Sequence, residues 1–435
     1  MEWRMRSTVL PVCFLLLLSQ TMVCAQATNP NDPSELIRAL LARVDQLEKR
    51  VAELEGRSPS PAVSAPAVQP GPEAVVGRTP AEPTTQQVAL GPDVHGGHMG
   101  SPQMNAPSTH IAGFSDFDFA ATDQPHTHSG FNEGQFVLHL NSALSSKVSF
   151  FGELSLTART DAGTGTPPAT GFNVEVERSI IRFEQNDYFK VSFGRYHTPI
   201  NYWNMTFHHG QWLQTTISRP EMVQFGGSFL PIHFVGALVE GAVPAGGLNL
   251  NYNFGLGNGR SSVISKAGDW GDINNNRAWL ATVFSRPDRL YGLQVGASVY
   301  RDLITPVGGL AFREWIQSAH IVWAKENPEL IAEFSNVSHQ EVGTTRQSNS
   351  QAWYVQTGYR LPGVARLWKP YYRFEYIHIP GSDHLFRLVP SLAGSTVGVR
   401  YDISSFAALK FEYRNIRRPG EPRINGAFAQ TSFTF

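Results

Sequence analysis

The stretch Leu248-Asn249-Leu250-Asn251-Tyr252-Asn253-Phe254 alternates apolar and asparagine side chains. Successive side chains of a β-strand point to opposite faces, so this period of two puts the apolar residues on one face and the asparagines on the other. The same alternation recurs throughout residues 111–435, for example over 148–157, 372–376 and 409–414. The sequence therefore predicts a large all-β domain.

The links between the predicted strands alternate in length. Seven are short, such as 145–146 and 404–405, and eight are long, of which 198–232 is the longest. A soluble sandwich has the same residue period, but strict alternation of links is expected when turns lie on one side of a membrane and loops on the other. We therefore expect a 16-stranded antiparallel transmembrane β-barrel over residues 111–435, with both ends on the short-turn side. Its apolar faces would meet lipid, and its polar faces would surround an aqueous lumen.

The composition fits such a barrel. Charged residues make up 16 % of the chain, below the roughly 25 % of soluble domains. The formal net charge of −1 predicts no strong attraction to nucleic acid. The mature sequence has no apolar segment of the roughly 20 residues that a spanning helix needs.

Residues 1–25 have the layout of a secretory signal peptide. Arginines precede an apolar run over residues 9–18, and Ala25 stands at the expected cleavage position. Both cysteines, Cys13 and Cys24, lie inside this segment, so the mature protein would contain no thiol. We predict an exported protein.

Residues 32–56 predict a helix that forms a short coiled coil. Asp32-Pro33-Ser34-Glu35 is typical of a helix start, and Gly56 ends the run. The β-branched and Leu core positions alone favour a dimer, whereas the order Arg-Val-x-x-Leu-Glu, present twice, resembles a motif of short trimeric coiled coils. A lone amphipathic helix packed on a core is the alternative. The expected oligomerisation residues are Ile37, Leu40, Arg43, Val44, Leu47, Glu48, Arg50, Val51, Leu54 and Glu55.

Residues 57–110 are rich in Pro, Gly, Ala, Ser and Thr and show no apolar period. This composition predicts an extended, disordered spacer.

The pairs His126/His128 and His208/His209 have no acidic third ligand nearby in sequence. We therefore predict no metal site and no cofactor.

The chain ends Ala427-Phe-Ala429-Gln-Thr431-Ser-Phe433-Thr-Phe435, which looks like the carboxy-terminal signature of bacterial outer-membrane barrels. Together with the signal, the coiled coil and the spacer, it resembles trimeric outer-membrane porins of the phosphate-selective-porin-like and DcaP-like group. The resemblance implies a homotrimer in the bacterial outer membrane, surrounded by lipid. It also implies a periplasmic N-terminal segment near peptidoglycan, and the passage of small polar or anionic solutes.

The third long link, 198–232, is unusually apolar for a solvent loop. In porins, which this chain resembles, that loop folds inward and narrows the pore; subunit contacts are the alternative for its aromatic residues. The polar residues expected to face solute on this loop are His208, His209, Gln211, Arg219 and Glu221.

The barrel wall is expected to add charged and amide side chains to the lumen. For each Arg/Glu pair, a structural ion pair across strands is an equal alternative. The expected wall residues are Lys147, Glu153, Arg159, Lys190, Asn249, Asn251, Asn253, Arg277, Arg373, Glu375, Arg400, Lys410, Glu412 and Arg414.

These features predict a porin that allows passive diffusion of small hydrophilic solutes. Phosphate-selective relatives rely on lumen lysines, but this chain has few lysines, and residues 111–435 hold 27 Lys+Arg against 26 Asp+Glu. The sequence therefore does not favour phosphate in particular, and small organic anions are an alternative class of solute. Sequence motifs of phosphate-binding loops, nucleophile elbows and zinc proteases are absent, so we expect no enzyme. The alternatives are a surface-attachment or structural protein with a plugged barrel, and an outer-membrane hydrolase.

Overall fold

The computed structural model describes residues 107–125, 127–158, 172–207, 209–224, 228–269 and 271–435. The predicted signal peptide (1–25), the coiled coil (32–56) with its oligomerisation residues and almost all of the spacer lie outside the described residues. So do Arg159 and His208. These parts of the analysis stay predictions.

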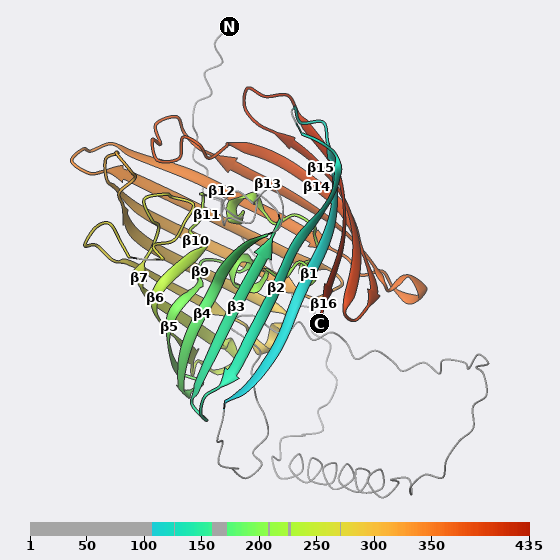
Figure 1. Ribbon diagram of the computed structural model, residues 1–435, viewed down its shortest axis with the longest axis horizontal. Helices are drawn as coiled ribbons and strands as arrows, with labels where there is room; N and C mark the ends of the chain where they lie inside the picture. The colour runs from blue at the N-terminus through green and yellow to red at the C-terminus, as the bar shows by residue number, and fades with distance from the viewer. Residues whose placement is uncertain (1–106, 126, 159–171, 208, 225–227, 270) are drawn as a thin grey trace, which may run out of the picture. The chain divides into compact units, whose positions relative to one another are not determined.

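The described residues form sixteen antiparallel strands in one closed sheet (Figure 1). The strands are β1 (Ser108–Thr122), β2 (Gly130–Ala143), β3 (Val148–Thr157), β4 (Asn173–Asn186), β5 (Phe189–His197), β6 (His233–Val243), β7 (Leu250–Asn258), β8 (Ala278–Ser285), β9 (Leu293–Ile304), β10 (Phe312–Ala324), β11 (Glu329–Glu341), β12 (Gln347–Gly358), β13 (Trp368–His378), β14 (Leu392–Ser404), β15 (Ala407–Arg417) and β16 (Ile424–Thr434).

Short helices lie in some of the links. They are α2 (Trp203–Phe207), η2 (Glu221–Val223), η3 (Gly246–Leu248), η4 (Asp288–Leu290) and η5 (Gly363–Ala365). Within the part of the chain that the structure describes, no helix is both long enough and apolar enough to cross a membrane.

The first strand closes the barrel by pairing on both of its edges. Ser108 of β1 lies opposite Ala143 of β2, and Phe114 of β1 lies opposite Thr434 of β16. The other strands pair with their neighbours in sequence, so the strand order follows the chain around the barrel. The predicted 16-stranded antiparallel barrel is confirmed. Its first strand begins three residues before the expected boundary at residue 111.

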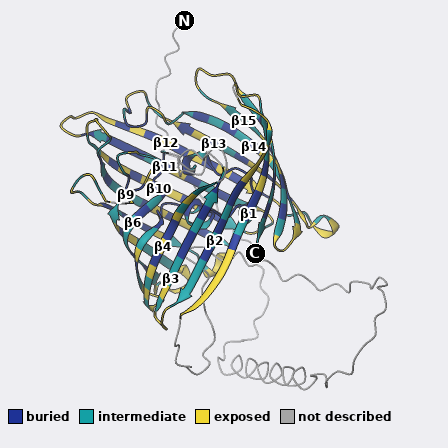
Figure 2. Ribbon diagram, viewed as in Figure 1, coloured by how far each residue is buried: buried dark blue, intermediate teal, exposed yellow. Residues whose placement is uncertain are grey.

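Strand β15 shows which face of the sheet lines the lumen and which face forms the outer surface. On β15, Lys410 and Glu412 are 0 % and 4 % exposed, whereas the adjacent Phe411 and Tyr413 are 50 % and 48 % exposed. A water-soluble barrel would bury the aromatic rings and expose the charges. Here the charges point into the barrel and the rings point outward, and the same alternation of buried and exposed residues runs along many strands (Figure 2).

The outer surface carries a continuous apolar row across five consecutive strands. On β11 the same face becomes polar a few residues further on, where Asn336 donates a hydrogen bond to Gln317 at 2.8 Å. An apolar band that ends at polar residues suits a wall surrounded by lipid. The apolar row consists of the directly paired residues Val295, Ile321, Ala332, Val355 and Phe374.

The inner wall is only partly polar. Buried apolar residues cross β6 to β11 at one level and belong to one hydrophobic cluster with Trp203, Phe207 and Phe229 of the third long link. The inward-folded link brings apolar side chains, and these are buried against an apolar part of the inner wall. The wall residues of this row are Leu238, Leu280, Tyr300, Ile316 and Val337.

The stretch with the clearest alternation in sequence begins in a turn rather than in a strand. Leu248 ends η3, and Asn249 has a φ of 43°, in the left-handed region that asparagine tolerates. The Asn249 amide donates to the carbonyl oxygen of Arg286 at 3.1 Å, which ties this turn to the next one. β7 therefore starts at Leu250, and Asn249 is a turn residue and not a lumen residue.

Candidate pore constriction

The third long link, residues 198–232 and called L3 below, folds into the barrel. Trp203 on α2 is 0 % exposed and contacts Phe207 and Tyr354 of β12 edge to face, with ring centroids 4.9 and 6.0 Å apart. Aromatic residues that water would solvate poorly thus pack against the inner wall. This is the inward fold that the sequence predicts.

The neck of L3 is closed by a backbone hydrogen bond from the N–H of Thr198 to the carbonyl oxygen of Ile232 at 2.8 Å and by the side chain of Asn204. The Asn204 amide nitrogen donates to the carbonyl oxygens of Thr198 and Ile232, both at 3.0 Å. These two residues directly follow β5 and directly precede β6. The two ends of the loop are therefore held together, and the rest of L3 extends from that point into the lumen.

The first turn of L3 is fixed to β11. Backbone N–H groups of Tyr202 and Trp203 donate to Glu333 Oε1 at 2.9 and 2.6 Å. These donors lie at the start of α2, where N–H groups have no acceptor within the helix. Asn201, with a φ of 62°, donates from its amide to Ser335 at 3.0 Å. The wall thus satisfies the polar backbone of the loop.

The later part of L3 is fixed to β13 and β15 across the lumen. Glu412 accepts from the N–H of Ile217 at 2.9 Å and from the hydroxyl of Ser218 at 2.7 Å. Arg373 donates to the carbonyl oxygen of Ser218 at 2.8 Å and to its hydroxyl at 2.6 Å. All four residues are buried. A charged wall residue of each sign therefore holds the same short piece of backbone.

Two further wall cations bind carbonyl oxygens of L3. Arg400 donates to Trp212 at 2.6 Å and to Gln214 at 3.0 Å. Lys410 donates to Thr216 at 3.1 Å and to the carbonyl of Gln211. Wall cations thus meet L3 carbonyl groups, and wall carboxylates meet its N–H groups. Such charge-assisted hydrogen bonds are stronger than neutral ones.

Glu221 lies at the start of η2, where its N–H donates to Glu375 Oε2 at 2.7 Å. Burial raises the pKa of the Glu221 carboxyl, and the nearby Glu375 carboxylate raises it further, while Arg418 and Arg414 act in the opposite direction. Two carboxyl groups of the expected pore set, those of Glu221 and Glu375, therefore lie close together.

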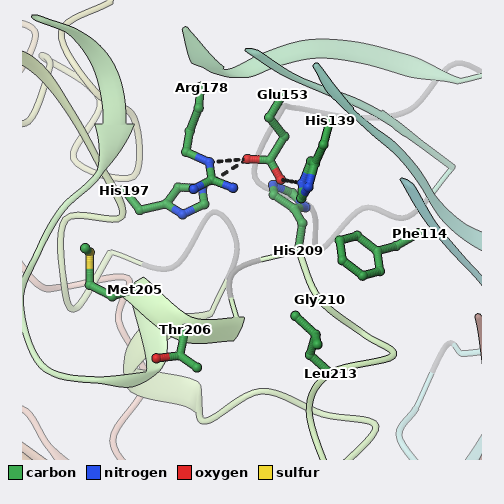
Figure 3. Close-up of a pocket in the computed structure, with 10 residues that line it drawn as sticks. All are labelled: Phe114, His139, Glu153, Arg178, His197, Met205, Thr206, His209, Gly210 and Leu213. Atoms are coloured by element: carbon green, nitrogen blue, oxygen red, sulfur yellow. Dashed lines mark hydrogen bonds and ion pairs between the residues drawn. The ribbon is translucent and has the colours of Figure 1, made fainter. Parts of the chain in front are cut away.

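A second group of charges lies on β2 to β5 (Figure 3). Glu153 of β3 is 2 % exposed and lies 2.9 Å from His139 Nε2 and 2.5 Å from Arg178 Nε. His197 Nε2 is 3.6 Å from the same carboxylate. His209 of L3 reaches this region, with Nδ1 3.3 Å from the Gln135 side-chain oxygen. L3 is thus anchored on this side as well.

A cavity of about 180 Å³ lies beside the first part of L3 and the inner faces of β4 to β10. Lys190, Asn251 and Asn253, three of the expected wall residues, line it. Arg182 and Glu240 also line it and form an ion pair at 2.8 Å. Sequence reasoning missed this pair. The signal was present, because Arg182 stands between Ile181 and Phe183, which are both exposed on the outer face.

Several expected site residues lie elsewhere or have other roles. Lys147 is an exposed turn residue 2.9 Å from Gln185, and Arg277 precedes β8 and pairs with Asp272 at 3.2 Å, so neither lies on the lumen wall. Arg414 lies 2.5 Å from Glu412 and over the ring of Phe428. Five of the expected wall residues contact L3, namely Arg373, Glu375, Arg400, Lys410 and Glu412.

The structure of this chain is similar to solved structures of porins. The anion-selective porin from Comamonas acidovorans matches 76 % of this chain and 100 % of its own, with 14 % identity and a TM-score of 0.52. OmpF of Salmonella typhi matches 75 % of this chain and 97 % of its own, with 11 % identity and a TM-score of 0.52. The chain has the porin fold.

The comparisons do not place the chain in a group of porins. DcaP of Acinetobacter baumannii matches 76 % of this chain and 97 % of its own at 13 % identity, with a TM-score of 0.49. No family model matches the sequence. No curated protein sequence matches it either. At these identities the likeness concerns the fold alone.

Proposed function

We propose that this protein is an outer-membrane porin through which small hydrophilic solutes diffuse passively. The observation that carries the proposal is a closed barrel with inverted polarity, in which L3 is fixed inside the lumen at several points of the wall. Inward charges and a fixed loop are the parts that select solutes by size and polarity in such a channel.

Planar-bilayer recording of the purified protein tests this function. A porin gives unitary conductance steps, whereas a barrel that serves as a plugged anchor gives none. The absence of steps would overturn the proposal. The inner apolar cluster makes this test worthwhile, because it shows that part of the lumen is filled. Esterase and protease assays on the same preparation test the hydrolase alternative, and we expect no turnover.

For selectivity, we propose a weak preference for small anions. The cavity beside L3 is lined by Arg182, Lys190 and Arg286 against Asp187 and Glu240, an excess of one positive charge. The anion-selective porin from Comamonas acidovorans shares the fold, which adds support. The reversal potential in a salt gradient measures the preference. A cation preference would overturn this part alone.

For assembly, we propose a homotrimer whose coiled coil (32–56) lies in the periplasm and spaces the barrels from peptidoglycan. The heptad positions and the repeated Arg-Val-x-x-Leu-Glu order support three strands. With an even number of barrel strands, the N-terminal segment leaves on the short-turn side, which faces the periplasm in bacterial outer-membrane barrels.

A further inference from the structure

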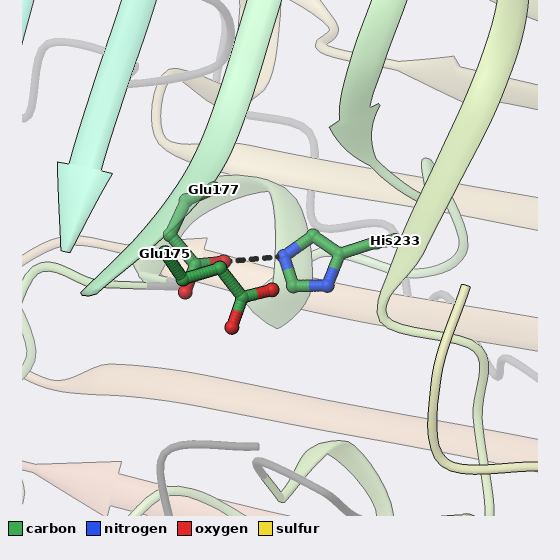
Figure 4. Close-up of side chains that lie close together, drawn as sticks. All are labelled: Glu175, Glu177 and His233. Carbon is green, nitrogen blue, oxygen red and sulfur yellow. Dashed lines mark ion pairs between the residues drawn. The ribbon is translucent and has the colours of Figure 1, made fainter. Parts of the chain in front are cut away.

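We infer that the chain binds one divalent transition-metal ion of the zinc class between Glu175, Glu177 and His233 (Figure 4). One possible ligand atom from each residue lies within 4.8 Å of the others. Glu177 Oε2 is 2.7 Å from His233 Nε2. Zinc with bonds of about 2.0–2.2 Å holds its ligand atoms roughly 3–4 Å apart, so small side-chain movements suffice to close the site.

The donor set is one imidazole nitrogen and two carboxylate oxygens. Three protein ligands with a water in the fourth position suit the tetrahedral preference of zinc. His209 of L3 lies outside this set, because its Nε2 is 3.2 Å from the Glu177 oxygen that does not contact His233. Magnesium and calcium prefer sites made of oxygen ligands. The donor set therefore favours a transition-metal ion over an alkaline-earth ion.

The backbone of β4 presents these carboxylates through a β-bulge. Val176 pairs with Leu154 and Arg178 pairs with Glu153, which leaves Glu177 as the extra residue. Arg195 of β5 donates to the carbonyl oxygens of Val176 at 2.6 Å and Glu177 at 2.5 Å, so the neighbouring strand holds the bulge in place. Bulges often redirect a side chain at a functional site. Here the bulge lets two successive residues, Glu177 and Arg178, both lie on the buried inner side of β4.

The charge of the site also suits a divalent cation. Arg195 forms ion pairs with Glu175 at 2.5 Å, Glu177 at 3.5 Å and Asp269 at 2.8 Å. One guanidinium against three carboxylates leaves two negative charges in excess when the histidines are neutral, as metal ligation requires. A bound divalent ion would balance them.

The site would hold the end of L3 against β4. Glu175 and Glu177 belong to β4, and His233 directly follows L3. The inference rests on the side-chain geometry of this region. The inferred metal site therefore does not depend on whether the barrel conducts ions.

Isothermal titration of the full detergent-solubilised chain with Zn²⁺ tests the inference. We expect one high-affinity ion per chain, and a loss of affinity of about 100-fold in E177Q and in H233Q, since each removes a ligand. E314Q and H339Q are the matched controls. His339 lies 3.0 Å from Glu314 through Nε2 and 2.9 Å from Asp383 through Nδ1, so these carboxylates lie on opposite edges of the ring and cannot share one ion with it.

Visible absorption of the unsubstituted chain with Co²⁺ gives a second readout that needs no variant. We expect the intense bands of low-coordinate Co²⁺, and their loss when Zn²⁺ is added in competition. Heat-modifiable mobility on gels establishes that the variants fold. A wild-type chain that binds neither ion would overturn the inference. Unchanged zinc affinity in folded E177Q and H233Q would do the same, because the ion would then lie elsewhere.

Discussion

Arg373 of β13 donates to the carbonyl and hydroxyl oxygens of Ser218 at 2.8 and 2.6 Å, although the two residues are 155 positions apart in the chain. Ser218 belongs to a loop that leaves the wall between β5 and β6, so this contact spans the lumen. Glu412 binds the same serine from β15. The position of L3 is therefore decided by charges on strands that the loop does not adjoin.

Removal of the Arg373 side chain should release the later part of L3. Arg373→Met removes three hydrogen bonds to Ser218 and Arg219. It also removes one of the cations near the buried Glu412 carboxylate. Breaking a buried ion pair costs about 3–5 kcal/mol. The barrel should still form, because its strand pairing is untouched, and unitary conductance should rise as the loop moves.

Arg366→Ala is the control for this variant, since Arg366 is exposed next to η5. Its conductance should equal that of the wild type. If Arg373→Met conducts like the wild type and L3 resists added protease equally well, the anchoring role of Arg373 is refuted.

The apolar outer row predicts that an added charge lowers the free energy of unfolding by an amount that depends on its position. Val355→Arg places a cation in the middle of that row on β12, and we expect a loss of about 2–4 kcal/mol in the free energy of unfolding from lipid vesicles. Gln351→Arg, on the same face but next to polar Asn336, should cost about 0–1 kcal/mol. Urea titration measures both. Equal costs would mean that the lipid boundary does not lie between these residues.

Glu221 should make the anchoring of L3 depend on pH. Its pKa is raised by burial and by the Glu375 carboxylate, so the protonated form is favoured in the folded state. The stability that this group contributes is complete below its unfolded pKa of about 4.3, and is lost as pH rises through the folded value. Glu221→Gln should therefore stabilise the protein at pH 7.

The difference in urea midpoint between Glu221→Gln and the wild type isolates this group, because other carboxyl groups titrate in both proteins. We expect that difference to grow between pH 4 and pH 7. A difference that stays constant with pH would contradict the shift of the Glu221 pKa.

Deletion of residues 34–56 should weaken the trimer and leave the pore intact. The expected interface residues of the coiled coil all lie in this segment. Semi-native gels should show a lower dissociation temperature for the oligomer, while bilayer steps of each barrel keep their size. Unchanged trimer stability would refute the oligomerising role of this helix.

The fold could be predicted from local patterns because each strand contributes its own evidence. Lys410, Phe411, Glu412 and Tyr413 alternate in sequence and alternate between the lumen and the outer surface in the structure. The pattern failed at Asn249, where a side-chain hydrogen bond and a left-handed backbone favour a turn. Local alternation cannot distinguish the last turn residue from the first strand residue.

The roles of the site residues could not be predicted in the same way. Arg400 and Lys410 were identified as lumen residues, but their partners are carbonyl groups of L3, almost 200 positions away. The grouping of Glu177 with His209 and His233 likewise depends on a bulge and on the path of L3. Nothing in their spacing along the chain brings these residues together.

The sequence by itself determined the strand number, the inverted polarity and the alternation of turns and loops, because side-chain period and link length are local properties of the chain. Only the tertiary structure decided which charges bind the loop, which line the cavity and which surround Glu177. Barrel closure and the inward course of L3 set those distances, and both arise from contacts between residues that are far apart in sequence.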